Sequence, residues 1–525
     1  MSDDEGGCHG RSFYSICLTL MSGLGRTCVW RDFGFDMVYA PVQQQADNSE
    51  NSKDARLPIV VDLDQTLILS DTLYETAAML FFKRPLSFVK CIPQLAKGRH
   101  SLKAAIASKV NLSDAVFPIR EDLVEWLHEK AKEGHELHLC SAADQSVVNN
   151  VAEHLGIFSS AIGSAHANLK GPAKAEYLKK QFPDGFIYVG DHAADLNVWK
   201  ESSGIVLAGT KPAVTARALA LEKPVIASFD NPKLNPKAFL KAIRVHHWSK
   251  NVLMFVPLIL AHEWTNIGLW LHAVVAFACL LAVTSATYLL NDIADVHADR
   301  HHWTKRNRAI ASGKLAIRSA FILAVGLLIG GFAVAFTITP RFGLALLAYL
   351  VITGAYSLGL KRVPLLDMLI IGVLFTLRLV MGVALLADPH PEWLLTFAVF
   401  FFFSLASAKR HTEIVRASLM GETSLKSRGY EVEDAPLTLA MGLGTAIASL
   451  VVMMIFILQE LLPSNSYSHP QPLALIPLVL SIWLGRIWLL SHRGKMNDDP
   501  VSFAIRDQTS IGLGVVVALL FVVSL

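Results

Sequence analysis

Hydrophobic positions divide this chain into two stretches of different character. From residue 55 to residue 235, short apolar segments alternate with amphipathic and charged ones, whereas residues 236–525 carry one long apolar run after another. Short apolar runs between turn signals are typical of buried strands, and runs near 20 residues have the length of a membrane-spanning helix. The pattern therefore predicts an α/β domain followed by a membrane domain. Residues 1–54 start acidic and end rich in Gln, Asn and Ser, which predicts a disordered segment.

The first stretch begins with a short β-branched run, residues 57–64, that ends in two acids and predicts a buried strand with carboxylates at its tip. Further helices and strands are then expected to alternate, which indicates a doubly wound parallel sheet. Residues 73–116 leave room for a small helical cap. The expected helices cover residues 120–133, 145–154 and 173–180, and the expected strands cover residues 136–140 and 186–189.

The second stretch predicts a polytopic bundle of about nine helices. Basic residues gather in alternate connections, after the second, fourth, sixth and eighth apolar runs. By the positive-inside rule these connections and the α/β domain face the cytoplasm, so a multi-pass protein of the plasma (inner) membrane is expected. The runs cover residues 252–260, 269–290, 319–338, 342–358, 366–386, 393–408, 437–462, 473–490 and 510–525.

Composition narrows these expectations. Of 525 residues, 53% are hydrophobic and 17% charged, which is too apolar for an ordinary soluble protein and makes the lipid bilayer a partner. The net charge of +3 is too small to indicate a nucleic-acid partner. The six cysteines show no paired spacing, which argues against a disulfide framework and against a structural zinc site.

Polar residues occur in a fixed order in the α/β domain, and three of the four groups follow a predicted strand. The groups are Asp62, Asp64 and Thr66, then Ser141, then Lys170 or Lys174, and then Asp191 and Asp195. This order resembles that of the haloacid dehalogenase (HAD) superfamily of phosphotransferases. The resemblance implies that Asp62 is the nucleophile and Asp64 the general acid/base. Gln65 stands where the commonest family pattern has glycine.

The same resemblance gives the remaining residues their roles. Asp191 would bind Mg²⁺ together with Asp62, Asp64 and Asp195, while Ser141, Thr66 and one of the two lysines would hold phosphate oxygens. The physical reason is that a carboxylate attacks a phosphate dianion only where metal and lysine charge offset the repulsion. The alternative is that these aspartates merely cap helices and close turns.

A second acidic set continues the second apolar run. Asp292, Asp295 and Asp299 have the spacing i, i+3 and i+7, which places three carboxylates, and nearly Asn291, on one face of a continuing helix. Crowding like charges at a membrane edge is costly without a cation, and oxygen ligands suit Mg²⁺. The basic residues that follow could hold phosphates, and they are Lys305, Arg306 and Arg308. The alternative is a solvated helix end with ordinary surface acids.

Residues 240–525 resemble the UbiA superfamily of intramembrane prenyltransferases, whose first metal motif, NDxxDxxxD, is matched at each fixed position by residues 291–299. The resemblance implies nine helices around a cavity that opens to the cytoplasm. A second family motif, DxxxD, is represented only by Asp367, which follows Lys361 in the connection after the fourth run. Ala309 replaces a proline that is frequent in the family, although Arg308 and Ile310 match.

Within this superfamily, residues 244–251, 409–413 and 428–430 look most like the decaprenyl-phosphate phosphoribosyltransferase branch. That branch implies a polyprenyl phosphate acceptor and a phosphoribosyl diphosphate donor, with Asp367 helping to place the sugar or a metal. The basic residues would act as phosphate clamps, unless they only set membrane topology. They are Lys250, Lys361, Lys409, Arg410 and Arg428.

The expected reaction is Mg²⁺-assisted departure of a diphosphate from carbon, with capture of the carbon by an acceptor. In the phosphoribosyl version the product retains a sugar phosphate, which the HAD-like domain could hydrolyse. One alternative is transfer of a prenyl chain from prenyl diphosphate to an aromatic or isoprenoid acceptor. Another is an ion-coupled transporter, although transporter acids usually lie near the bilayer midplane.

Overall fold

Six parallel strands form the sheet of the α/β region, in the order β3-β2-β1-β4-β5-β6. The computed structural model describes residues 57–113, 115–164, 169–387, 392–425, 428–463, 467–496 and 500–525, and the predicted disordered segment 1–54 lies outside them. The predicted parallel α/β sheet is confirmed, although three of its strands were not predicted. The strands are β1 (Ile59–Val61), β2 (Leu137–Cys140), β3 (Ser160–Ile162), β4 (Ile187–Gly190), β5 (Gly204–Ala208) and β6 (Val225–Phe229).

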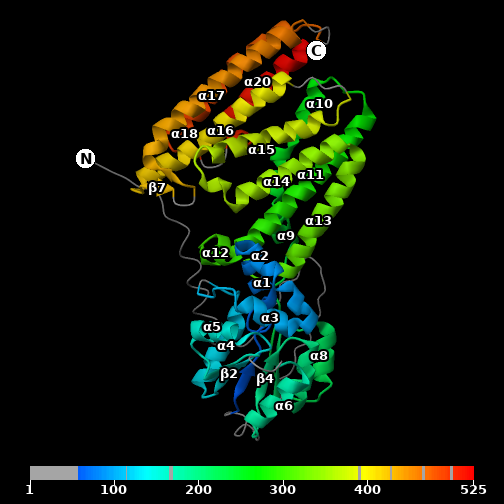
Figure 1. The fold of residues 1–525 in the computed structure, drawn as a ribbon, viewed down its shortest axis with the longest axis vertical. Helices are drawn as coiled ribbons and strands as arrows, with labels where there is room; N and C mark the ends of the chain where they lie inside the picture. The colour runs from blue at the N-terminus through cyan, green and yellow to red at the C-terminus, as the bar shows by residue number, and fades with distance from the viewer. Residues whose placement is uncertain are drawn as a thin grey trace, which may run out of the picture. The chain divides into compact units, whose positions relative to one another are not determined.

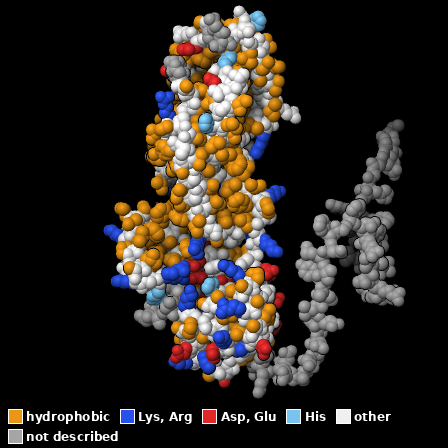
Figure 2. All heavy atoms as spheres, turned by 90° about the vertical axis from the view of Figure 1, so that its right-hand side faces the viewer, with side chains coloured by type: hydrophobic (Ala, Val, Ile, Leu, Met, Phe, Trp, Pro, Cys, Tyr) orange, Lys and Arg blue, Asp and Glu red, His pale blue; other side chains and the backbone are white. Residues whose placement is uncertain are grey.

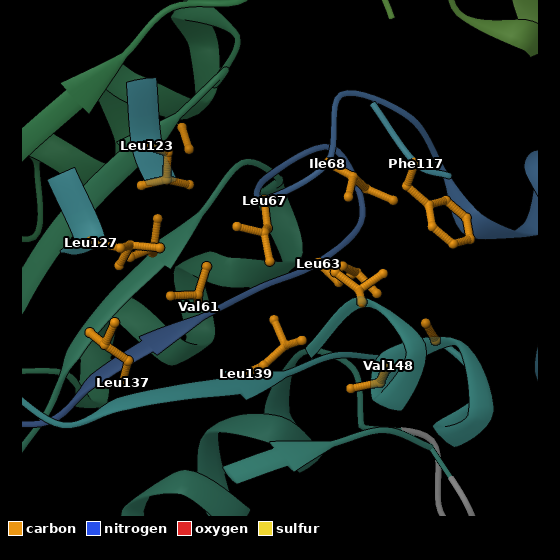
Figure 3. Packing of buried hydrophobic residues seen from close by; sticks show 14 of the residues in the cluster. Val61, Leu63, Leu67, Ile68, Phe117, Leu123, Leu127, Leu137, Leu139 and Val148 are labelled. Atoms are coloured by element: carbon orange, nitrogen blue, oxygen red, sulfur yellow. The ribbon is translucent and has the colours of Figure 1, made fainter. Parts of the chain in front are cut away.

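Both faces of this sheet are covered by helices (Figure 1). Val61 and Leu139 pack in one core, shown in Figure 3, with α4 (Glu121–Lys132) and α5 (Gln145–Leu155). Val60, one residue from Val61, packs in the opposite core, because successive strand residues point to opposite faces. The helices on that second face are α6 (Pro172–Gln181), α7 (Leu196–Glu201) and α8 (Pro212–Leu219).

A small helical cap, residues 72–107, is inserted between β1 and α4. It contains α1 (Thr72–Lys83), α2 (Pro85–Val89), the 3₁₀ helix η2 (Ile92–Lys97) and α3 (Arg99–Ala107). Its own small core includes Leu73, Leu80, Cys91 and Ile106. The cap begins one residue before the range 73–116 that the sequence left for one, and it ends within that range.

The rest of the described chain is mostly helical, apart from the short antiparallel strands β7 (Ser424–Leu425) and β8 (Tyr430–Glu431). Seven of its described helices are long and apolar enough to cross a membrane. Hydrophobic side chains cover much of this region, whereas charged side chains gather on the α/β region (Figure 2). The prominent helices are α11 (Ile267–Ala294), α13 (Ile317–Ile338), α14 (Pro340–Leu358), α15 (Leu366–Val383), α16 (Glu392–Leu419), α17 (Ala435–Phe456) and α18 (Ile476–His492).

The prediction of nine spanning helices is not confirmed among the described residues. The run 252–260 forms the end of a 3₁₀ helix followed by α10 (Val256–Leu260), which is only five residues long and carries Pro257 in its first turn. At the other end of the bundle, α20 (Gln508–Ser524) has 17 residues and is somewhat shorter than the seven. Apolar composition therefore located these two segments without fixing their helical length.

Cap helix α1 packs directly on the helical bundle. Ala78 shares a buried cluster with Leu289 of α11 and Ala320 of α13. Next to this cluster, Arg300 of α12 (Val296–His301) donates to both carboxylate oxygens of the fully buried Glu75, at 3.0 and 2.8 Å. The α/β region and the bundle thus share both an apolar core and a buried ion pair.

Candidate active sites

Three aspartates meet at the carboxyl edge of the sheet. Asp62 follows β1 and Asp191 follows β4, because parallel strands deliver the residues after them to one edge. Asp195 lies on the next short 3₁₀ helix, and one carboxylate oxygen from each of the three lies within 4.8 Å of the others. Lys174 donates to Asp62 Oδ1 at 2.8 Å, and Thr66 Oγ1 donates to Asp191 Oδ1 at 3.2 Å. The structure therefore brings five of the predicted residues together.

Charge in this site is poorly balanced. Burial, with the neighbouring charges of Asp195 and Asp62, raises the pKa of Asp191 to about 8. Burial also raises the pKa of Asp62, although the Lys174 ammonium opposes that rise. For Lys174, burial acts to lower the pKa, but Asp62 outweighs it and the pKa is raised. Three carboxylates face one buried lysine here, and such an oxygen-only set fits a hard divalent cation such as Mg²⁺.

Asp64 lies outside this three-acid group, contrary to its prediction as a metal ligand. Its Oδ1 accepts from the backbone N–H of Thr72 at 2.7 Å, and its Oδ2 accepts from Lys103 Nζ of the cap at 2.8 Å. Lys103 was not predicted, since it lies 39 residues away in sequence and no local pattern marks it. Asp64 thus faces the cap, where a residue that exchanges protons with a leaving group would be placed.

The other residues predicted for this site line one shared cavity of about 730 Å³ with Asp62. Ser141 is buried there, and its Oγ accepts from the backbone N–H of Ala143. Of the two candidate lysines, Lys174 contacts Asp62, whereas Lys170 lies exposed at the cavity wall. Gln65 has φ of 61°, a left-handed conformation that glycine adopts without strain, which explains why glycine suits this position.

The second acidic set differs from its prediction. Helix α11 ends at Ala294 and α12 begins at Val296, so no single helix carries the whole motif, and Asp295 between them is exposed. Asp292 and Asp299 are buried, and both accept from Arg308 Nη1, at 3.2 and 2.6 Å. The prediction that three carboxylates share one helical face is therefore wrong for Asp295, because the helix is interrupted at that residue.

Arginines neutralise the two buried carboxylates of this set. Arg244, just before the bundle, donates to Asp292 Oδ1 at 2.6 Å, in addition to the Arg308 bonds. Two guanidinium groups thus face two carboxylates, so this set has less uncompensated negative charge than the sheet-edge set. Lys305 and Arg306 are exposed, and Asn291 is half-buried.

A third group surrounds Asp367, which is fully buried at the start of α15. Arg410 donates through two nitrogens to Asp367 Oδ2, at 2.8 and 2.7 Å. Tyr356 donates to Oδ1 at 2.8 Å and accepts from Arg428 at 2.6 Å, while Arg428 also approaches Oδ1 at 3.4 Å. Asp367, Arg410 and Arg428 were predicted from three separate segments, but Tyr356 was not. Lys250, Lys361 and Lys409 are half-buried.

Comparison with known proteins follows the boundary between the two regions. Residues 252–506 match the model of the UbiA prenyltransferase family. The chain belongs to this family. The UbiA resemblance inferred from residues 291–299 is thereby confirmed, whereas the HAD resemblance of the α/β region stays a prediction.

Individual proteins are also similar to this chain. The uncharacterized protein y4nM of Sinorhizobium fredii is 42% identical over 476 residues, covering 90% of this chain and 92% of its own. Decaprenyl-phosphate phosphoribosyltransferase of Corynebacterium glutamicum is 33% identical over 222 residues, covering 41% of this chain and 67% of its own. A solved UbiA homolog from Archaeoglobus fulgidus, bound to GPP and Mg²⁺, is 15% identical with a TM-score of 0.40, covering 55% of this chain and 98% of its own.

Proposed function

We propose that the helical region of this UbiA-family protein transfers a 5-phosphoribosyl group from phosphoribosyl diphosphate to a polyprenyl phosphate. The observation that carries the proposal is the presence of two separate arginine groups, one at Asp292 and Asp299 and the other at Asp367. Both substrates of this reaction are anionic, whereas an aromatic acceptor would need only one such group. The similarity to the Corynebacterium glutamicum enzyme supports the same reaction.

In the proposed reaction, the bond between ribose C1 and the diphosphate oxygen breaks, and an oxygen of the lipid phosphate forms the new bond to C1. Bound Mg²⁺ would neutralise the diphosphate leaving group, with Asp292 and Asp299 as its ligands and Asp295 at the rim. Arg244 and Arg308 would turn from these carboxylates to diphosphate oxygens. Arg410 and Arg428, placed by Asp367, would orient the other anionic substrate.

The transferase proposal is tested with membranes from cells that express the protein. Radiolabelled phosphoribosyl diphosphate and a polyprenyl phosphate should give a labelled lipid, and Asp292→Asn should abolish the labelling because the buried ligand is lost. Glu433→Gln is the matched control, since Glu433 is an exposed acid elsewhere in the helical region. Absence of labelled lipid, together with prenyl transfer to a hydroxybenzoate acceptor, would contradict the proposal.

We infer further that the α/β region is a phosphatase of the HAD type that removes the phosphate remaining on the transferred sugar. Asp62 Oδ would attack phosphorus and form an aspartyl phosphate, while the sugar oxygen leaves with a proton from Asp64. Water would then release inorganic phosphate and regenerate Asp62. Lys174 and bound Mg²⁺ on Asp62, Asp191 and Asp195 would offset the charge. Mg²⁺-dependent phosphate release from ribose 5-phosphate by the purified protein tests this proposal.

We propose that this phosphatase site and the basic connections of the bundle face the cytoplasm in the plasma membrane. Arg300, Arg308 and Lys314 belong to the connection after α11, which is also the connection that contacts Glu75 of the cap. An α/β region attached there lies on the side that the positive-inside rule assigns to the cytoplasm. Protease added to right-side-out vesicles should leave the α/β region intact, and cleavage there would contradict this orientation.

A further inference from the structure

The cavity that contains Asp62 is built from three parts of the chain. Its walls come from the sheet edge, from the cap and from the first turn of α13, where Ala316, Ile317, Arg318 and Ser319 line it. A volume of about 730 Å³ is typical of a site for a whole small molecule and exceeds what one phosphate group requires. The bundle therefore supplies part of the wall of the phosphatase site.

The cavity contains cations beyond the two that pair with Asp62 and Asp64, and a further carboxylate, Asp71, which interacts electrostatically with Arg99. Lys174 and Lys103 are paired with Asp62 and Asp64. Five further cationic side chains line the cavity and make no salt bridge with a carboxylate in the described part of the chain. His100 also lines the cavity, and its Nε2 is buried without a hydrogen-bond partner among the described residues. The five are Lys97, Arg99, Lys170, Lys211 and Arg318.

Arg318 lies where the cap meets the bundle. Its guanidinium lies over the ring of Tyr74 in α1, 5.9 Å from the centroid. Around it, the Glu75–Arg300 ion pair joins the same two parts, and Gly313 approaches Leu69 so closely that a Cβ on Gly313 would lie 2.6 Å from Leu69 Cβ. Arg318 is exposed and lines the cavity, with the Tyr74 ring of the cap beside its guanidinium.

We propose that Arg318 and the cap residue Arg99 form a second anion subsite, which binds the phosphodiester of a membrane-anchored phosphosugar while its terminal phosphate lies at Asp62. This inference rests on the phosphatase function proposed above and specifies its substrate class. A substrate with two phosphate groups separated by a sugar matches a cavity that has the catalytic acids at the sheet edge and, on the cap and on α13, Arg99 and Arg318, which make no salt bridge in the described residues. Because Arg318 begins a membrane helix, the phosphodiester would lie on the lipid side.

Two soluble probes separate this subsite from the catalytic one. The full-length protein in detergent is assayed with ribose 5-phosphate, which has one phosphate, and with ribose 1,5-bisphosphate, whose second phosphate mimics the diester. The wild-type protein should show a kcat/KM at least tenfold higher for the bisphosphate. Arg318→Ala should lower that preference tenfold or more, mainly through KM, because the lost contact serves binding. Arg318→Lys should restore part of the preference, since it retains the charge without the planar fork.

Arg341→Ala is the matched control, because Arg341 is an exposed arginine of the helical region that lies outside the cavity, and it should keep the wild-type preference. Equal hydrolysis of both probes by the wild-type protein would overturn the second subsite and leave the phosphatase proposal standing. An unchanged preference in Arg318→Ala would also overturn it. Failure to hydrolyse either probe in Mg²⁺ would instead overturn the phosphatase proposal itself.

Discussion

The two regions of this molecule bury carboxylates in opposite ways. At the sheet edge, Asp62, Asp191 and Asp195 share one lysine, and burial together with mutual repulsion raises the pKa of Asp191 to about 8. In the helical region, each buried carboxylate of the described residues is matched by guanidinium groups, as where two nitrogens of Arg410 donate to one oxygen of Asp367. The first arrangement favours binding of a cation, and the second favours exchange of an arginine between a carboxylate and a substrate anion.

The largest expected effect is the loss of one activity without loss of the other. Asp62→Asn should lower phosphate release by 10³-fold or more, about 4 kcal/mol in activation free energy, because the amide cannot form the phosphoenzyme. Lipid labelling by the same variant should stay at the wild-type rate. The exposed Asp184→Asn serves as the control in both assays. Parallel loss of both activities would show that the two regions share one site.

Removing an arginine from the helical region should destabilise the fold. Arg410→Ala removes a positive charge that faces the buried Asp367 carboxylate. The free energy of unfolding should fall by about 3–5 kcal/mol. Thermal unfolding in detergent should show a large drop in Tm. Lys179→Ala, which breaks the exposed pair with Glu201, provides the comparison and should change Tm little. A Tm for Arg410→Ala equal to that of the control would show that Asp367 is not held by this contact.

Metal and pH should act together at the sheet edge. Because its pKa is raised, Asp191 keeps its proton in the folded protein up to about pH 8 but loses it near pH 4 when unfolded. Without metal, the contribution of Asp191 to the free energy of unfolding therefore falls as pH rises from about 4 to about 8. Mg²⁺ needs the ionised form, so its affinity should fall up to tenfold, about 1.4 kcal/mol, for each unit below pH 8. The Tm increase caused by Mg²⁺ should be larger at pH 8.5 than at pH 6, and Asp191→Asn should remove this difference.

The smallest expected effect concerns the loop of the metal site. Gln65 has a positive φ, so Gln65→Gly should relieve backbone strain and stabilise the α/β region by about 1 kcal/mol or less. Differential scanning calorimetry on the full chain measures this gain. Gln94→Gly, at a residue of η2 with ordinary helical conformation, should instead destabilise. A loss of stability in Gln65→Gly would show that other contacts of the glutamine side chain outweigh the strain.

Much of the catalytic edge of the sheet could be predicted from the sequence, because Asp62 and Asp191 each directly follow an apolar strand. The strand 57–64 and the run before Gly190 located Asp62 and Asp191. Strand β3 was not predicted because it contains only three residues, all half-buried. Strand β6 is the outermost strand on one side of the sheet and is partly exposed, so it lacks a continuous buried pattern. Local patterns therefore identified β1, β2 and β4, but missed the buried β5 as well as the two outermost strands.

Partners across long sequence distances could not be predicted in this way. Lys103 reaches Asp64 from the cap, and Arg244 reaches Asp292 across 48 residues. The spacing of Asp292, Asp295 and Asp299 assumed an uninterrupted helix, and the break at Asp295 changed which of them are buried. Arg318 carried no signal at all, since it resembles any basic residue at the end of a membrane helix. Its significance depends on how the cap packs against α13.

The Glu75–Arg300 pair has a consequence for anyone who divides the chain. A cut in the connection between β6 and the bundle would separate Glu75 from Arg300. The α/β fragment would keep a carboxylate that has lost its partner, and the membrane fragment would keep an unpaired guanidinium. The newly exposed surfaces around Ala78 and Ala320 would be apolar and prone to aggregation. Co-expression of both halves, or paired Glu75→Leu and Arg300→Leu replacements, is therefore the sensible starting point for producing either part.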